Sequence, residues 1–262
     1  AVKLLQRHTT ELDLPSIAAL ARLPQMEWAD DRLAARVLNT ISPSAHLTDD
    51  AERWFLWVAF HSLDLFRRRG NTLESCHGYS LVGMTFCAMG DPERGMAFHR
   101  LAVQLAELSG NVVQLLRTTT CMSFHEPWRE SLPSTATLAR QAWMHCLDGG
   151  YWFHAQWAAS SLVAACLHGG APLATLAAEA HRSLDFVRAH PGLDLGPAFE
   201  AAIRLAEDLG GRGEEAWMEP DGTDPGEALA SVRNEKARVA AQGTRVLALI
   251  LRDRWEEAAL LA

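Results

Sequence analysis

Hydrophobic residues recur with the helical period of 3.6 along almost the whole chain, and this pattern constrains the fold more than any other feature. Almost no segment alternates apolar and polar residues as a half-buried strand does. The helical segments are separated by glycines such as Gly90, Gly170 and Gly210, and glycine readily takes the left-handed conformation that ends a helix. With 262 residues, 48% of them hydrophobic, the chain is large enough to bury a sizeable core. The sequence therefore predicts an all-α fold.

The connections between the expected helices are short, and short connections place consecutive helices antiparallel to each other. A long series of such helical hairpins forms a solenoid, so we expect a right-handed superhelix built from antiparallel pairs. By residue number, the expected helices cover 30–41, 49–69, 73–89, 91–109, 112–124, 132–147, 151–168, 173–189, 197–209, 225–240, 243–252 and a last one that begins near 255.

The expected domain organisation follows from the places where the helical period is interrupted. Residues 1–29 are an N-terminal flank, and 30–211 form the repeat domain. An acidic linker rich in glycine and proline covers 212–224, and 225–262 form a further hairpin of the same solenoid. The chain starts without methionine and stops inside the apolar-periodic stretch RWEEAALLA. We therefore expect it to be a piece of a larger protein.

Charge and cysteine usage narrow the classes of function. The formal net charge is −8, from 24 basic and 32 acidic residues without a long run of either sign, which argues against binding to a nucleic-acid backbone. No apolar run reaches the roughly 18 to 20 residues that span a bilayer, and no secretory signal is present at the N-terminus. The five cysteines are odd in number and widely spaced, which favours reduced, buried thiols. We expect a cytoplasmic protein that binds neither membranes nor nucleic acid.

The stretch GMTFCAMGDPERGMAFHRLA, residues 83–102, contains very small residues at positions where two helices are expected to meet. Gly83 lies on the first helix, and Gly95 and Ala102 lie on the second. Residues without bulk allow two helix backbones to approach closely. Asp91 is placed to cap the second helix, and Pro92 fits its first turn, where a missing N–H costs nothing.

This stretch resembles the tetratricopeptide repeat, whose pattern combines a bulky residue, an aromatic, a Gly-Asp turn and small residues in the second helix. In this sequence Gly95 replaces the usual alanine of the repeat, and His99 replaces the usual aromatic residue. A partial second copy covers Leu249, Trp255 and Ala258. The resemblance implies degenerate tetratricopeptide-like hairpins of irregular length. The residues that define the first copy are Tyr79, Val82, Gly83, Phe86, Gly90, Asp91, Gly95 and Ala102.

Roughly residues 30–262 also resemble the helical region of large bacterial and fungal signalling proteins. Three motifs carry this resemblance: the aspartate-led helix that ends in Arg-Gly-Asn at 69–71, the Gly-Asp turn at 90–91 and the Pro-Trp-Arg loop at 127–129. In that family the region joins a STAND-type ATPase, often preceded by a serine/threonine kinase, to GAF and histidine-kinase modules. The resemblance implies that the partners are a protein or the flanking ATPase and kinase domains.

No catalytic signature is present in the sequence. A phosphate-binding G-x-x-x-x-G-K-[ST] loop is absent, GYSLVG at 78–83 does not match a nucleophile elbow, and HEPWR at 125–129 has no second histidine. The sequence predicts no cofactor and no metal, because no helix carries histidines at the spacing of metal ligands. An all-α enzyme using the histidines with Glu126 or Asp148 is the least favoured class. The histidines weighed as metal ligands are His145, His154, His168, His181 and His190.

One stripe of the helix at 73–89 is expected to face the concave groove of the repeat, where it would contact a partner or small ligand. A neighbouring repeat that covers the stripe is the alternative. Other candidate contacts are Trp128 and Arg129 in the Pro-Trp-Arg loop and Trp152 at a helix start, for which packing between helices is the alternative. The residues of the stripe are His77, Ser80, Met84 and Cys87.

These observations favour a non-enzymatic helical-repeat module that recognises a protein partner or transmits a signal inside a larger ATPase or kinase. The second hypothesis is a small-molecule sensor, as in the related maltose-responsive transcription activators, whose helical repeats bind an inducer.

Overall fold

The computed structural model describes residues 11–45, 51–125, 131–217, 230, 232 and 235–261. Among these residues the regular elements are all helices, and the only strand-like pairing is an isolated bridge between Gln25 and Asn71. The prediction of an all-α fold is confirmed. In the same part of the chain, no helix combines the length and the apolar character needed to cross a bilayer. The chain divides into two compact units, Ala1–Glu130 and Ser131–Ala262, which we call unit 1 and unit 2.

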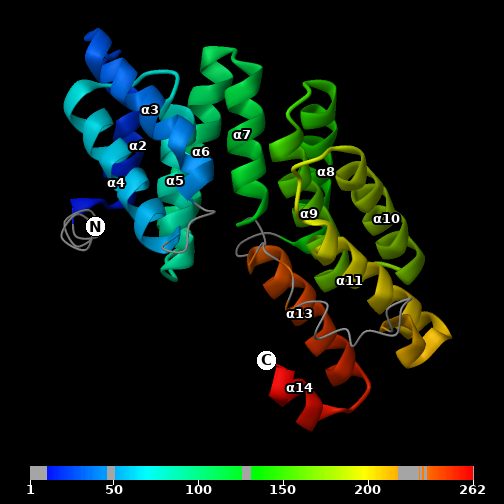
Figure 1. Cartoon of the computed structure of the whole chain (residues 1–262). Helices are drawn as coiled ribbons and strands as arrows, with labels where there is room; N and C mark the ends of the chain where they lie inside the picture. The colour runs from blue at the N-terminus through cyan, green and yellow to red at the C-terminus, as the bar shows by residue number, and fades with distance from the viewer. Residues whose placement is uncertain are drawn as a thin grey trace. The chain divides into compact units, whose positions relative to one another are not determined.

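Unit 1 is organised around helix α5, of which twelve of the 14 residues are buried. Helix α5 packs against α3, α4, α6 and α7 (Figure 1). Burial on nearly all sides is expected for a helix in such a central position, and four of its buried residues are polar, namely Ser75, His77, Ser80 and Thr85. The elements of unit 1 are α2 (Leu14–Ala19), a 3₁₀ turn (Leu20–Arg22), α3 (Ala29–Ala45), α4 (Ala51–Arg69), α5 (Ser75–Ala88), α6 (Pro92–Ser109) and α7 (Val112–Ser123).

Aromatic side chains form the centre of the unit 1 core. The rings of Phe66 and Tyr79 lie 5.4 Å apart edge to face, and those of Phe86 and Phe98 lie stacked at 5.6 Å. The buried hydroxyl of Tyr79 donates a hydrogen bond to Oδ1 of Asn71 at 2.7 Å. This partner removes the cost of burying the phenol. Two of the residues that define the repeat, Tyr79 and Phe86, therefore hold core positions.

The segment before residue 30, expected to be a flank, contributes to this core. Leu12, Ile17, Leu20 and Met26 are all buried in the same cluster. Helix α2 starts after Asp13, whose carboxylate accepts a hydrogen bond from the backbone N–H of residue 16 at 2.9 Å. The helix has six residues, which is too short to show a hydrophobic period.

The turn between α5 and α6 has the predicted features. Gly90 takes a positive φ of 82°, which favours glycine. The Asp91 carboxylate accepts a hydrogen bond from the backbone N–H of Arg94 at 3.1 Å and also pairs with its guanidinium at 2.6 Å. Pro92 is the first residue of α6. The predictions for Asp91 as the cap and Pro92 as a first-turn residue are confirmed.

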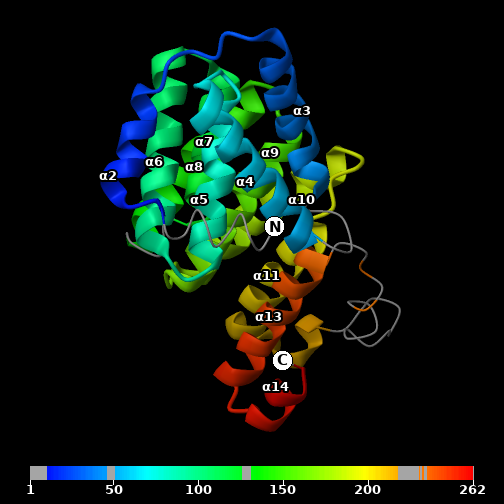
Figure 2. The ribbon, with the colours of Figure 1, turned by 90° about the vertical axis from the view of Figure 1, so that its left-hand side faces the viewer.

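Unit 2 consists of helices in which consecutive members pack against each other, including α8 with α9, α10 with α11, and α11 with α13. Figure 2 shows α11 and α13 side by side. Buried Glu179 of α10 pairs with Arg140 of α8 at 2.6 Å and with Arg182 at 3.2 Å. The elements are α8 (Leu132–Asp148), α9 (Trp152–His168), α10 (Leu173–Ala189), α11 (Gly196–Glu207), a π turn (Asp208–Arg212), a 3₁₀ turn (Gly213–Trp217), α13 (Glu235–Leu251) and α14 (Trp255–Leu261).

Two helices extend past the residues where the sequence predicted their ends. Instead of separate helices at 225–240 and 243–252, one helix, α13, runs from Glu235 to Leu251 through Gly243. A single glycine lowers the stability of a helix by about 1 kcal/mol without ending it. Helix α3 continues to Ala45 through Pro43, which has no N–H for the carbonyl of Asn39. That carbonyl accepts a hydrogen bond from the Ser42 hydroxyl at 2.9 Å instead.

Candidate functional site

The predicted groove stripe on α5 is covered inside unit 1. His77, Ser80 and Cys87 are buried, and Met84 is half-buried. Helix α3 covers one end of the stripe, where the Ser42 hydroxyl lies 3.1 Å from Nε2 of His77. The alternative of a stripe covered by neighbouring helices therefore describes three of the four residues. Their contact with a ligand or partner stays a prediction.

The three other predicted contact residues do not join this stripe. Trp128 and Arg129 lie outside the described residues. Trp152, at the start of α9, is partly exposed and packs against the end of α10 in unit 2. Its ring lies 6.1 Å from that of Phe186 and 4.6 Å from that of His190. This contact matches the helix-packing alternative for Trp152.

The small residues of the 83–102 stretch lie where α5 and α6 cross. A Cβ atom on Gly83 would lie 2.8 Å from the carbonyl oxygen of Gly95, and a Cβ atom on Gly95 would lie 2.9 Å from that of Gly83. Ala102, which lies on α6 together with Gly95, is fully buried. The two backbones are therefore as close as predicted, and the glycines face each other.

Two chemically active side chains occupy the space beside these glycines. A Cβ atom on Gly95 would meet the Sγ atom of Cys87 at 2.2 Å, and a Cβ atom on Gly83 would meet the ring of His99 at 3.1 Å. The two glycines, which have no side chains, therefore have a second effect besides the close approach of the helices. They leave room for Cys87 and His99 inside the crossing.

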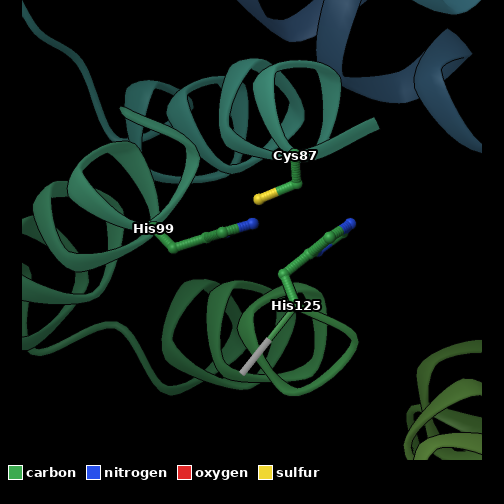
Figure 3. A group of neighbouring side chains, drawn as sticks. All are labelled: Cys87, His99 and His125. Atoms are coloured by element: carbon green, nitrogen blue, oxygen red, sulfur yellow. The ribbon is translucent and has the colours of Figure 1, made fainter. Parts of the chain in front are cut away.

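His125 completes a cluster with these two residues, as Figure 3 shows. Cys87 lies near the end of α5, His99 in the middle of α6, and His125 two residues after the end of α7. One possible metal-binding atom from each residue lies within 4.8 Å of the other two. The two imidazole rings stack at a centroid distance of 5.1 Å. Three helices of unit 1 therefore bring one thiol and two imidazoles together.

The hydrogen bond of His125 defines which of its two ring nitrogens has a lone pair free to bind a metal. Nδ1 lies 3.2 Å from the backbone carbonyl oxygen of Cys121. Because a carbonyl only accepts, Nδ1 carries the proton of this bond and Nε2 keeps its lone pair. Burial lowers the pKa of His125, and its bond to Cys121 partly opposes that effect. Burial therefore favours the neutral form of the ring.

His99 is fully buried, and neither of its ring nitrogens has a hydrogen-bond partner among the described residues. Burial, together with the neighbouring His125, holds the pKa of His99 well below its usual value. Leaving a buried polar atom without a partner costs about 1 to 3 kcal/mol. His99 is thus a neutral imidazole with unsatisfied nitrogen atoms next to a thiol.

The thiol of Cys87 is protonated in these surroundings. Burial raises its pKa to about 11, and the negative charge of Asp91 adds to this effect. A reactive cysteine needs a lowered pKa, so the arrangement does not favour Cys87 as a nucleophile. A cysteine thiol and two imidazoles are instead the donor types that could hold a transition metal.

The sequence did not predict this cluster, because its members are 12 and 26 residues apart on three elements. Helical spacing indicates only ligands that share one helix, and none of the five histidines considered as metal ligands in the sequence belongs to the cluster. One local signal was present. His99 occupies a position where the repeat pattern has an aromatic residue, and glycines on both helices leave space beside it.

Comparisons of the chain with protein-family models, with curated proteins and with solved structures find no match.

Proposed function

We propose that this chain is a non-catalytic helical-repeat module that recognises a protein partner or transmits a signal within a larger ATPase or kinase. The proposal includes tetratricopeptide-like antiparallel hairpins stacked into a right-handed superhelix. Packing of α5 on α6, α8 on α9 and α10 on α11 through short connections supports it. The close glycine contact between α5 and α6 supports it as well.

The observation that carries the recognition function is an apolar stripe on the outer face of α3. Leu33, Val37 and Ile41 are 59%, 51% and 38% exposed. Their spacing of four residues places them along one ridge of the helix. We call these three residues the α3 stripe. Neighbouring exposed apolar residues of this kind often mark interaction sites on protein surfaces.

Helix α3 does not use these bulky residues to pack on unit 1. Its buried face carries Ala35, Asn39, Ser42 and Ala45. Asn39 donates a hydrogen bond through Nδ2 to the carbonyl of Glu74 at 3.0 Å, and Ser42 contacts His77. Small residues and hydrogen bonds thus attach α3, and the large apolar side chains remain outside.

Charged residues border the α3 stripe, as they do in many interfaces with an apolar centre. Arg36 pairs with Glu74 at 3.3 Å, and Asp31 pairs with Arg69 at 3.4 Å. A row of side chains four residues apart fits into the groove between rows on a second helix. The partner that suits the α3 stripe is therefore the apolar face of an amphipathic helix, either on another protein or on a flanking domain.

The test is a capture experiment with three forms of the protein. The double variant Leu33→Glu/Val37→Glu places two charges on the α3 stripe. The control Arg32→Glu changes the net charge by the same −2 at an exposed position on another side of the helix. Circular dichroism verifies that all three are folded. The forms are incubated with flanking ATPase and kinase domains and with cell extract, and bound proteins are quantified by mass spectrometry.

The proposal expects a partner whose recovery falls at least about tenfold in the double variant, since burying an unpaired charge costs several kcal/mol. The control Arg32→Glu should recover that partner as well as the natural sequence does. Recovery of no partner above background, or equal recovery by the double variant, would refute the proposal.

A further inference from the structure

We propose that Cys87, His99 and His125 bind one zinc ion in unit 1. The three residues lie on α5, α6 and just after α7, and their side chains surround one space inside unit 1 (Figure 3). The site is independent of the α3 stripe and of the recognition function proposed above.

The donor atoms select the kind of metal. One sulfur and two imidazole nitrogens are ligands for zinc and its neighbours among the transition metals. Calcium and magnesium prefer oxygen ligands, and the cluster has none among its three members. Zinc has no preferred geometry from d-electrons and takes sulfur and nitrogen together. It is therefore the ion that this set fits best.

The distances allow coordination after small movements. With zinc–sulfur and zinc–nitrogen bonds of about 2.0 to 2.3 Å, tetrahedral ligands lie roughly 3.3 to 3.6 Å from each other. The donor atoms of Cys87, His99 and His125 already lie within 4.8 Å of one another. Each separation therefore has to shrink by no more than about 1.5 Å. Rotation of the side chains has to supply this shift and also has to turn the two stacked imidazoles, so that one nitrogen of each faces the ion.

The hydrogen bonding of the two histidines points to a metal independently of the distances. His99 is fully buried with both ring nitrogens unpartnered among the described residues, and a metal ion would provide one of them with a partner. His125 has its Nδ1–H on the Cys121 carbonyl at 3.2 Å. Histidine ligands usually donate their second N–H to a carbonyl or carboxylate in this way. His125 therefore already has the outer contact of a metal ligand.

Binding requires one proton to leave the site. The Cys87 thiol loses its proton to solvent as the sulfur–zinc bond forms, and the two imidazoles bind as neutral ligands through their lone pairs. The positive ion then stabilises a thiolate that burial alone disfavours. The ion and the thiolate together carry a net charge of +1, and the three residues provide three of the four ligands of a tetrahedral zinc site. One ion would join the ends of α5 and α7 to the middle of α6.

The experiment uses the full chain after removal of metals with a chelator and removal of the chelator. Cobalt(II) is titrated first, because a cysteine thiolate bound to cobalt gives a charge-transfer band in the near-ultraviolet. Zinc is then added to displace it, and thermal unfolding is recorded with and without zinc. The variants are Cys87→Ser and His125→Gln. The controls are Cys76→Ser, a buried thiol on the same helix, and His181→Gln, an exposed histidine of unit 2.

The proposal expects one cobalt per chain with a thiolate band, its loss on addition of zinc, and a higher Tm in the presence of zinc. Cys87→Ser should lose the band, and His125→Gln should bind at least about 100-fold more weakly, since even outer contacts of metal ligands are worth 10- to 100-fold. Both controls should bind as the natural sequence does. The absence of a thiolate band in the natural sequence, its persistence in Cys87→Ser, or an unchanged band and Tm after zinc is added would overturn the proposal.

Discussion

Replacing Gly95 by alanine tests the packing of α5 on α6 at its closest point. The new Cβ atom would lie 2.9 Å from the carbonyl oxygen of Gly83, 3.0 Å from the backbone nitrogen of Cys87 and 2.2 Å from its Sγ atom. The sulfur can rotate away, but the two backbone atoms move only if the helices separate. Overpacking of this kind costs about 1 to 3 kcal/mol.

The helix propensity of alanine opposes this cost. Alanine is favoured over glycine inside a helix by about 1 kcal/mol. The expected net result for Gly95→Ala is a loss of about 1 kcal/mol, which corresponds to a Tm lower by roughly 2 to 8 °C. The displaced sulfur should also weaken the binding of zinc, because Cys87 is one of the three proposed ligands.

The matched control is Gly243→Ala in α13. Gly243 is exposed within a helix, and a Cβ atom there would have no neighbour within 4 Å. The propensity gain is then unopposed, and the expected result is stabilisation by about 0.5 to 1 kcal/mol. Both variants are measured by differential scanning calorimetry. If Gly95→Ala raised the Tm as the control does, the close approach of α5 and α6 would be wrong.

Two further predictions concern single buried groups. Glu179→Ala should lower the free energy of unfolding by about 1 to 2 kcal/mol in urea denaturation, because Arg140 and Arg182 lose their shared partner; an unchanged value would contradict the role of this pair. Burial raises the pKa of the Cys76 thiol from 9.0 to about 11. Because the folded protein keeps this thiol protonated more strongly than the unfolded chain does, the thiol's contribution to the free energy of unfolding is complete below pH 9 and is lost as the pH rises toward 11. Between pH 9 and 10.5, Cys76→Ser should therefore lose stability less steeply than the natural sequence, by up to about 1.4 kcal/mol per pH unit, and equal slopes would refute this assignment.

The sequence predicted the helices whose signals are local. Periodicity, the cap at Asp91 and the glycine at the turn placed α6 within one residue of its observed start. Helix α2 was missed because six residues are too few to show a period, although Asp13 and Pro15 form a normal start signal. The continuity of α13 was missed because a glycine inside a helix and a glycine after one look alike in sequence.

The orientation of α3 could not be predicted from its pattern. An apolar row on a helix usually faces the core, yet Leu33 and its neighbours on the α3 stripe face outward. The reason is tertiary, since Asn39 and Ser42 find hydrogen-bond partners at Glu74 and His77. Such contacts join residues 35 positions apart, and no local rule contains them.

The candidate site was hidden for the same reason. Gly83 and Gly95 were identified as contact points between helices, but the side chains that fill the space beside them could not be assigned from spacing. His125 follows α7 and reaches the cluster through the packing of α7 against α5 and α6. The sequence therefore predicted the helix crossing that surrounds the site, but it did not predict the cluster of one thiol and two imidazoles.

X-ray absorption at the zinc edge of the zinc-saturated protein tests most directly whether the crossing of α5 and α6 builds a metal site. We expect one sulfur at about 2.3 Å and two imidazole nitrogens at about 2.0 to 2.1 Å around the ion. In Cys87→Ser the sulfur should disappear from this shell. A spectrum of the natural sequence with only oxygen and nitrogen neighbours would contradict the assignment.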